Sequence, residues 1–289
     1  MKITSSFINE INLSDKAVHT IIFKNTKHQM KFRYKLNQYF IRKQEVDKYV
    51  NLVDEYYKKK DARSFYFVNL NFSAVYAATE KSTDQLIKKV LTHHLNHNPE
   101  LINLYQKVVY SIEEFLSNIN LEYHDIDLEF EITDKVISNM LKAIKVHIDY
   151  KDEELVSNNE VRKLLISSLL DLNMTEQEVF ILINYPEGEM AKDSFSDFVN
   201  YLKGLNATVV ILTSAPEFIS WIDNDKLFLI NESGNQYDII KLKQELLEFK
   251  YVNEKSSKLV ANKLAYHDFM KDYMLLDPKY RYFLKSSKI

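Results

Sequence analysis

The chain has no cysteine and only three glycines among its 289 residues. Without cysteine it can form no disulfide, thiolate zinc site or cysteine nucleophile, and we expect an intracellular protein. None of the glycines lies in the first 187 residues. Loops that bind phosphates need glycines, because their backbone N–H groups must approach the phosphates closely. The sequence therefore disfavours an ordinary nucleotide-dependent enzyme.

Long apolar runs are also missing, although 46% of the residues are hydrophobic. No run approaches the roughly 18 apolar residues that a membrane-spanning helix needs, and the N-terminus lacks the pattern of a signal peptide. The composition is that of a globular protein of one or two domains, and we expect no membrane partner.

The most informative stretch begins with the apolar run Val179–Ile183. The run is short and β-branched, which predicts a strand buried on both faces. A helical pattern follows and ends at Gly204, where we expect a left-handed backbone, and a second buried strand is predicted at Thr208–Thr213. Strand, helix and strand of this length predict a parallel βαβ unit, whose sites lie after the strands at residues 184–187 and 214–217.

Further strands are predicted at Val18–Phe23, Ser64–Leu70 and Lys226–Ile230. The polar residues 1–18 predict an edge strand or an arm, and the apolar spacing from Lys31 to Tyr57 predicts a helix.

Helical patterns fill the long segment between two strands of the sheet, where Asn98 and Pro99 predict one helix start. Two terminal helices are predicted at Gln236–Lys250 and Lys255–Tyr273. We therefore predict an α/β protein with a parallel-sheet head (residues 1–73 and 175–245), an inserted α-helical leg (74–174) and a helical C-terminal extension (246–289).

Charge is unevenly distributed, although the net charge is only −3. Residues 24–63 hold twelve Lys or Arg and five acids, whereas residues 108–134 hold eight acids and neither Lys nor Arg. Such segregation can form a basic surface for a polyanion and an acidic surface for a cation. The alternative is that both are ordinary solvated faces.

Acids and apolar residues alternate from Asp125 to Glu131. In an extended conformation, four carboxylates share one face and repel one another, which a hard cation such as calcium would relieve. A solvated acidic face is the alternative interpretation. His93 and His97 have the spacing of a metal pair, but a solvated helix end is favoured. No residue is nominated as catalytic, since the central strand ends with Asn184 and the nearest acid is Glu187.

Several of these segments together resemble a known family. Ile126–Glu131 is similar to a family motif L-D-L-E-Y-D, and Lys145–Ile148 follows at a like distance. The other matching segments are Asn96–Leu101, Val179–Asn184, Asn206–Thr213 and Asp225–Ile230, within a resemblance that covers roughly residues 15–235. The family is the ring-forming CRISPR-associated adaptation protein of type II-A systems, the Csn-two family.

This resemblance implies a homotetrameric ring of α/β heads with helical legs. The head would resemble a P-loop nucleotide-binding fold that has lost its phosphate loop. Double-stranded DNA ends would thread a positively charged hole, and calcium on the leg would stabilise the ring. The implied role is spacer acquisition (adaptation) in antiviral defence, in the bacterial cytoplasm, with the integrase subunits and the type II effector nuclease as partners. Neither catalysis nor a nucleotide cofactor is implied.

The resemblance assigns calcium ligation to Asp125, Asp127, Glu129 and Glu131, although the family more often has aspartate at the last position. Glu122 is a further acid nearby. Lysines that contact DNA phosphates are chosen by charge: Lys27, Lys31, Lys58, Lys59, Lys60, Lys142 and Lys145.

An enzyme is the alternative function. It would be a diverged nucleotide phosphohydrolase or a metal-dependent nuclease, with catalytic magnesium held by the acidic stretch of residues 122–131.

Overall fold

The computed structural model describes residues 1–43, 47–71, 88, 91–93, 97–118, 158–171, 177–188, 190 and 193–286. The chain divides into two compact units. Unit 1 comprises Met1–Ala74, Ser157–Lys163 and Thr175–Ile289, and unit 2 comprises Val75–Val156 and Leu164–Met174.

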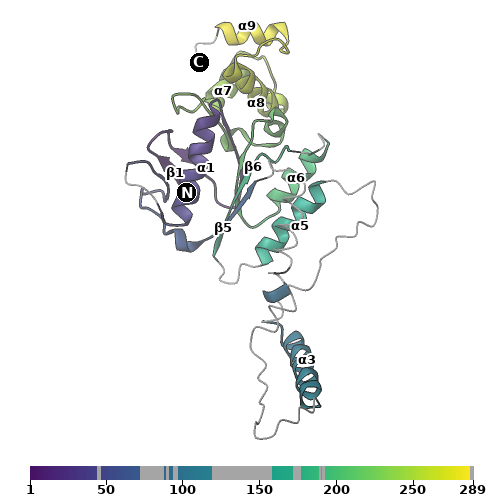
Figure 1. Ribbon diagram of the computed structural model, residues 1–289. Coiled ribbons are helices and arrows are strands. Elements are labelled where there is room, and N and C mark those ends of the chain that lie inside the picture. The colour runs from purple at the N-terminus through teal and green to yellow at the C-terminus, as the bar shows by residue number, and fades with distance from the viewer. Residues whose placement is uncertain are drawn as a thin grey trace. The chain divides into compact units, whose positions relative to one another are not determined.

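Unit 1 is built around a five-stranded sheet with the order β5-β6-β7-β3-β8, in which all neighbouring strands are parallel (Figure 1). The apolar runs of the sequence form these strands because they can bury both of their faces. Every residue of β3, β7 and β8 is buried. The strands are β3 (Val18–Phe23), β5 (Phe65–Asn71), β6 (Glu178–Asn184), β7 (Thr208–Leu212) and β8 (Leu227–Ile230).

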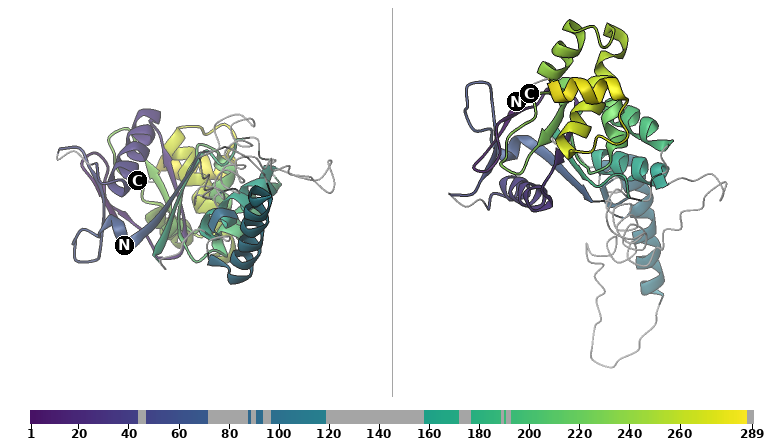
Figure 2. Two further views of the ribbon diagram at one scale, coloured as in Figure 1. Left: turned by 60° about the horizontal axis from the view of Figure 1, so that its bottom comes forward. Right: turned by 90° about the horizontal axis from the view of Figure 1, so that it is seen from above.

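The predicted βαβ unit is confirmed by β6, α6 (Ser194–Lys203) and β7. Helix α6 covers one face of the parallel sheet and α1 (Thr26–Phe40) covers the other (Figure 2).

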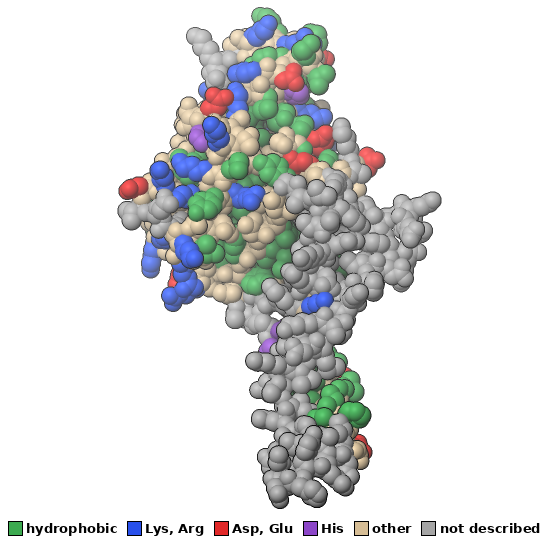
Figure 3. All heavy atoms as spheres, in the orientation of Figure 1, with side chains coloured by type: hydrophobic (Ala, Val, Ile, Leu, Met, Phe, Trp, Pro, Cys, Tyr) green, Lys and Arg blue, Asp and Glu red, His purple; other side chains and the backbone are tan. Residues whose placement is uncertain are grey.

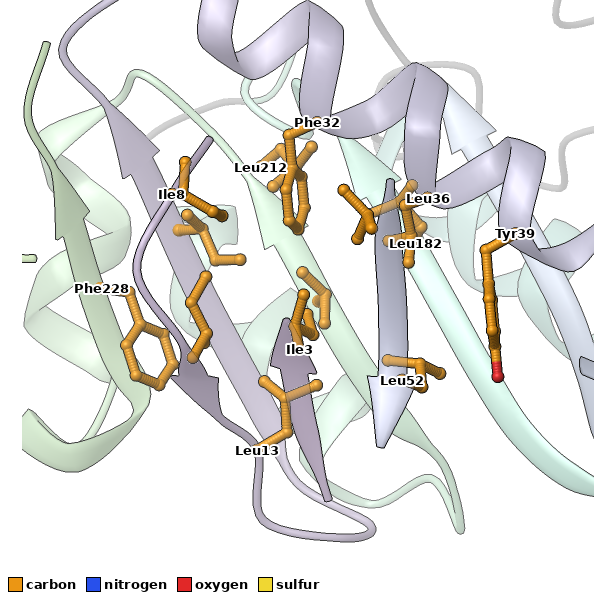
Figure 4. Packing of buried hydrophobic residues seen from close by; sticks show 14 of the residues in the cluster. Ile3, Ile8, Leu13, Phe32, Leu36, Tyr39, Leu52, Leu182, Leu212 and Phe228 are labelled. Carbon is orange, nitrogen blue, oxygen red and sulfur yellow. The ribbon is translucent and has the colours of Figure 1, made fainter. Parts of the chain in front are cut away.

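A second, antiparallel sheet lies against α1. Its order is β2-β1-β4, with β1 at Lys2–Ser5, β2 at Ile11–Asn12 and β4 at Val50–Val53. Apolar side chains of this sheet, of α1 and of the parallel sheet form one buried cluster (Figure 4). Helix α1 is therefore held on two sides, which fixes the positions of its polar residues.

Of two predictions for this region, one holds only in part and the other is wrong. Residues 1–18 hold an edge strand, β2, but β1 is the central strand of the small sheet and Ile3 is fully buried, so the segment is not an arm. The helix predicted from Lys31 to Tyr57 begins earlier, at Thr26, and ends at Phe40. Residues Val50–Val53 form a strand instead, because pairing with β1 overrides the helical spacing of the valines.

The predicted left-handed end of α6 is also wrong. Gly204 has a φ of −76° and caps the helix through its N–H, which donates to the carbonyls of Asn200 and Tyr201. Glycine conformation matters instead at Gly234, where φ is +82°. Its carbonyl accepts the Asn9 N–H at 2.8 Å, which ties the β8–α7 connection to the N-terminal segment.

The C-terminal helices belong to unit 1. They are α7 (Ile239–Glu248), α8 (Glu254–Met270) and α9 (Pro278–Ser286). Asn262 of α8 is fully buried, and its amide donates to the carbonyls of Ile219 and Ile222 at 2.8 and 2.9 Å. These bonds and the buried Phe269 fix α8 to the rest of the unit.

In unit 2, α3 runs from Pro99 to Ser117 and begins as predicted, with the Asn98 side chain accepting the Glu100 N–H at 3.0 Å. Helix α5 runs from Asn158 to Asp171; its residues up to Lys163 belong to unit 1 and the rest belong to unit 2. No helix among the described residues is long and apolar enough to cross a membrane.

Candidate nucleic-acid interface

The basic stretch of residues 24–63 folds around α1. Its first part connects β3 to α1 through Lys24 and Asn25 alone. Asn25 is the N-cap, and its side chain accepts the Lys27 N–H at 2.8 Å. The helix thus begins where nucleotide-binding α/β proteins place their phosphate loop, with a side-chain cap on its first turn.

Lys27 and Lys31 lie in the N-terminal half of α1. Lys27 is exposed, so its ammonium faces water. Lys31 is half-buried, and its Nζ lies 4.0 Å from the centre of the Phe7 ring. A cation held over an aromatic face keeps its charge, so Lys31 can still attract a polyanion.

The three consecutive lysines follow a tight turn after β4. Asp54 Oδ1 accepts the N–H groups of Tyr56 and Lys58, each at 2.9 Å. The chain then doubles back, since Lys59 forms a bridge to Val53. This turn brings Lys59 and Lys60 against Tyr39, near the C-terminal end of α1.

Tyr39 joins the turn to the helix. Its hydroxyl donates to the Lys60 carbonyl at 2.7 Å, and Lys59 Nζ lies 5.6 Å from the centre of its ring. Burial raises the pKa of Tyr39 far above its ordinary value, so the hydroxyl keeps the proton that it donates. A hollow opens beside this contact, which we call the basic hollow; it is lined by Tyr39, Arg42, Lys59, Lys60, Asp61 and Ala62.

The sequence prediction missed Arg42. It belongs to the basic stretch, but its place beside Lys59 depends on where α1 ends and where the chain returns after β4. Lys60 is partly neutralised, because its Nζ forms an ion pair with Glu178 at 2.9 Å.

The predicted lysines thus fall into two groups on unit 1. Lys27 and Lys31 lie toward one end of α1, and Lys58, Lys59 and Lys60 lie near the other. From Lys31 to Tyr39 the helix rises about 12 Å at 1.5 Å per residue. Lysine and arginine side chains gather over the part of unit 1 that contains α1 and β1 (Figure 3).

The strand ends predicted as a site come together, but their polar groups bond to one another. Asn184 is fully buried, and its amide donates to Asn69 Oδ1 at 3.1 Å and to the Leu70 carbonyl at 2.9 Å. The Glu187 carboxylate accepts the Thr213 hydroxyl at 2.8 Å and the Ser214 N–H at 2.9 Å. These contacts connect β6 to β5 and to the end of β7.

Buried Arg162 of α5 fixes the same loop from the other side. Its guanidinium donates to the Pro186 carbonyl at 2.6 Å and to the Gly188 carbonyl. Tyr185 has a φ of 50°, a strained conformation for a residue other than glycine. The contacts of Arg162 and Glu187 therefore hold a strained turn in place.

The acidic stretch and two of the lysines lie outside the described residues, namely Asp125, Asp127, Glu129, Glu131, Glu122, Lys142 and Lys145. In the part of the chain that is described, no three His, Asp or Glu side chains are grouped to hold a metal ion. The rings of His93 and His97 are 4.5 Å apart, but His97 Nδ1 lies 2.9 Å from the His93 carbonyl oxygen.

No protein-family model matches this sequence, and no curated protein matches it. Among solved structures, the chain is similar to Stu0660 of Streptococcus thermophilus, with 15% identity, 99% of each chain covered and a TM-score of 0.64. A nucleotide-free ATP-binding cassette from an ABC transporter matches with 14% identity over 88% of this chain and 100% of its own, with a TM-score of 0.43. The likeness to Stu0660 is one of fold, and it extends over nearly the whole of both chains.

Proposed function

We propose that this chain is a non-catalytic protein that binds the ends of double-stranded DNA. The observation that carries this proposal is the basic surface around α1, formed by lysines from two separate parts of the sequence. Phosphates along a duplex attract such a surface whatever the base sequence, so the binding would weaken as salt is added.

The biological role follows from the resemblance to the Csn-two family. The protein would form a calcium-stabilised homotetrameric ring and act in spacer acquisition beside the integrase subunits and the type II effector nuclease. The head would be a P-loop-like fold without its phosphate loop. The short β3–α1 connection, with Asn25 as the helix cap, supports this interpretation.

Calcium would be held by the acidic stretch, through Asp125, Asp127, Glu129 and Glu131 with Glu122 nearby. Carboxylate oxygens are the ligands that calcium prefers, and a single cation would relieve the repulsion among them. In this role the metal is structural.

The alternative, a phosphohydrolase or nuclease, is less well supported by the strand ends. A metal-dependent enzyme of this fold class places carboxylates there to hold magnesium. Here the Asn184 amide donates to Asn69 and Leu70 of β5, and the Glu187 carboxylate accepts from Thr213 and Ser214. Both side chains serve to hold strand ends together.

Size-exclusion chromatography with light scattering, in calcium and in a chelator, tests the assembly. We expect about four times the 34.3 kDa chain mass in calcium and smaller species in the chelator. The same fractions should bind a linear duplex at least about tenfold more tightly than a closed circle, because only a duplex with ends can thread a ring.

Variants separate calcium binding from a general effect of charge. The substitutions Asp127→Asn and Glu129→Gln together should abolish the response to calcium. The matched substitutions Glu232→Gln and Glu248→Gln remove the same charge from exposed positions of unit 1 and should leave it intact. A monomer that ignores both calcium and DNA ends would contradict the proposal, and activity on ATP or DNA with magnesium would favour the enzyme.

A further inference from the structure

We propose that the basic hollow is a binding site for a phosphate group, with Arg42 and Lys59 as the residues that contact it. The inference rests on the proposed function for its choice of ligand source, the backbone of duplex DNA. Its chemistry, however, is that of any accessible phosphate, whether free in solution or part of a nucleic acid. It also adds Arg42, a residue that charge along the sequence did not select.

The walls of the hollow are fixed by the backbone. Tyr39 is 2% exposed, and its hydroxyl holds the Lys60 carbonyl at 2.7 Å. The Lys60 N–H donates to the Leu52 carbonyl at 2.9 Å, so the lysine segment is also anchored to β4. Arg42 has a left-handed φ of 56°, and its N–H donates to the Tyr39 carbonyl at 3.1 Å. Side chains that start from a fixed backbone lose less entropy when they close on a ligand.

Of the acids near the hollow, Glu178 is held in an ion pair, whereas Asp61, which lines the hollow, is held by a backbone N–H. Glu178 pairs with Lys60, and Asp61 accepts the Arg63 N–H at 2.9 Å as the cap of a short 3₁₀ helix, Ala62–Ser64. Within the described ranges, no carboxylate forms an ion pair with the Arg42 guanidinium. Its planar fork of N–H donors matches two phosphate oxygens, and Lys59 supplies a second charge to the same hollow.

A structural role for these cations is the alternative. Positive charges beyond a helix C-terminus can offset the partial negative charge of its last carbonyls. In α1, however, the carbonyls of Asn37, Gln38 and Tyr39 accept the backbone N–H groups of Ile41, Lys43 and Arg42 at 2.9–3.1 Å. Backbone groups already satisfy these carbonyls, so the guanidinium of Arg42 is not needed to cap them.

The test compares two double variants in binding to a linear duplex at several salt concentrations, measured by fluorescence anisotropy. Arg42→Gln with Lys59→Gln removes the two charges of the hollow. Lys255→Gln with Lys263→Gln removes two charges from exposed positions of α8, away from the hollow. Thermal unfolding of each variant shows whether the fold is kept.

We expect the hollow variant to bind about tenfold more weakly. The slope of log affinity against log salt should become shallower by about 0.9 for each phosphate that the variant no longer neutralises. The α8 variant should stay within about twofold of the wild type. Equal weakening in both variants, or none in the hollow variant, would reject the DNA backbone as the ligand of the hollow while leaving DNA binding itself established.

A second arm uses inorganic phosphate and pyrophosphate as probes, with the melting temperature as the readout. A ligand that binds the folded state raises this temperature. Suppose that phosphate raises the melting temperature of the wild type but not of the hollow variant, and that the wild type binds no DNA. This result would support the phosphate site and reject the proposed function. If only DNA binding responds to the variant, the phosphate belongs to nucleic acid. A hollow variant that matches the wild type in both arms would reject the site.

Discussion

At the scale of single residues, His19 is an ionisable side chain that this fold holds uncharged. It lies in β3, fully buried, and its ring is 6.0 Å from that of Phe228. Nε2 is 3.0 Å from the Ser14 carbonyl oxygen, so this nitrogen carries the proton, and Nδ1 is buried with no partner among the described residues. Burial lowers the pKa of His19 below its ordinary value because a charged ring would lose its hydration.

This shift predicts a loss of stability in acid. Between the lowered folded pKa and the ordinary value of about 6.5, the unfolded chain binds a proton that the folded chain does not, so the free energy of unfolding falls as pH falls through that window. Urea unfolding at pH 7.5 and at pH 5.5 measures it. His19→Gln keeps an N–H donor but does not titrate, and it should show a smaller decrease. An equal decrease in both proteins would contradict the assignment to His19.

At the scale of elements, the long buried strands were predictable and the small sheet was not. Val179–Ile183 and Val209–Leu212 carry apolar side chains on both faces, a pattern that few other elements produce. Strand β4 has only four residues, and it is stabilised by pairing with β1, almost fifty residues away. The basic hollow was missed for the same reason, since the contact between Tyr39 and Lys60 depends on the turn after β4.

The connection between β8 and α7 gives a prediction at this scale. Gly234 has a φ of +82°, and a Cβ there would lie 2.3 Å from the Phe7 carbonyl oxygen. Gly234→Ala should therefore destabilise unit 1 by about 1–3 kcal/mol, through both backbone strain and the clash. Gly204→Ala is the matched control, because its φ is −76° and the nearest atom to its Cβ would be 3.3 Å away. Denaturant unfolding should show a larger loss of stability for Gly234→Ala than for Gly204→Ala. Similar stabilities would show that the backbone at Phe7 can move away from the added Cβ at little cost.

At the scale of the whole molecule, the C-terminal extension is part of the structure of unit 1. Leu264, Ala265 and Phe269 of α8 are buried, and the Asn262 amide donates to the carbonyls of Ile219 and Ile222. Helix α9 contributes less, chiefly the buried Phe283, whose ring is 4.8 Å from that of Tyr251. The two helices should therefore differ in how much the head depends on them.

Two truncations test this difference. A chain that ends after Lys250 loses α8, exposing the apolar faces that it covered and leaving the carbonyls of Ile219 and Ile222 without their donors. Removing buried Leu and Phe side chains costs about 2–5 kcal/mol each, so the total approaches the 5–15 kcal/mol that holds a typical domain together. We expect this chain to unfold without a cooperative transition. A chain that ends after Tyr273 loses only α9 and should keep the transition at a lower temperature. If the chain that ends after Lys250 still melts cooperatively, the head is a domain that folds without α8 and α9.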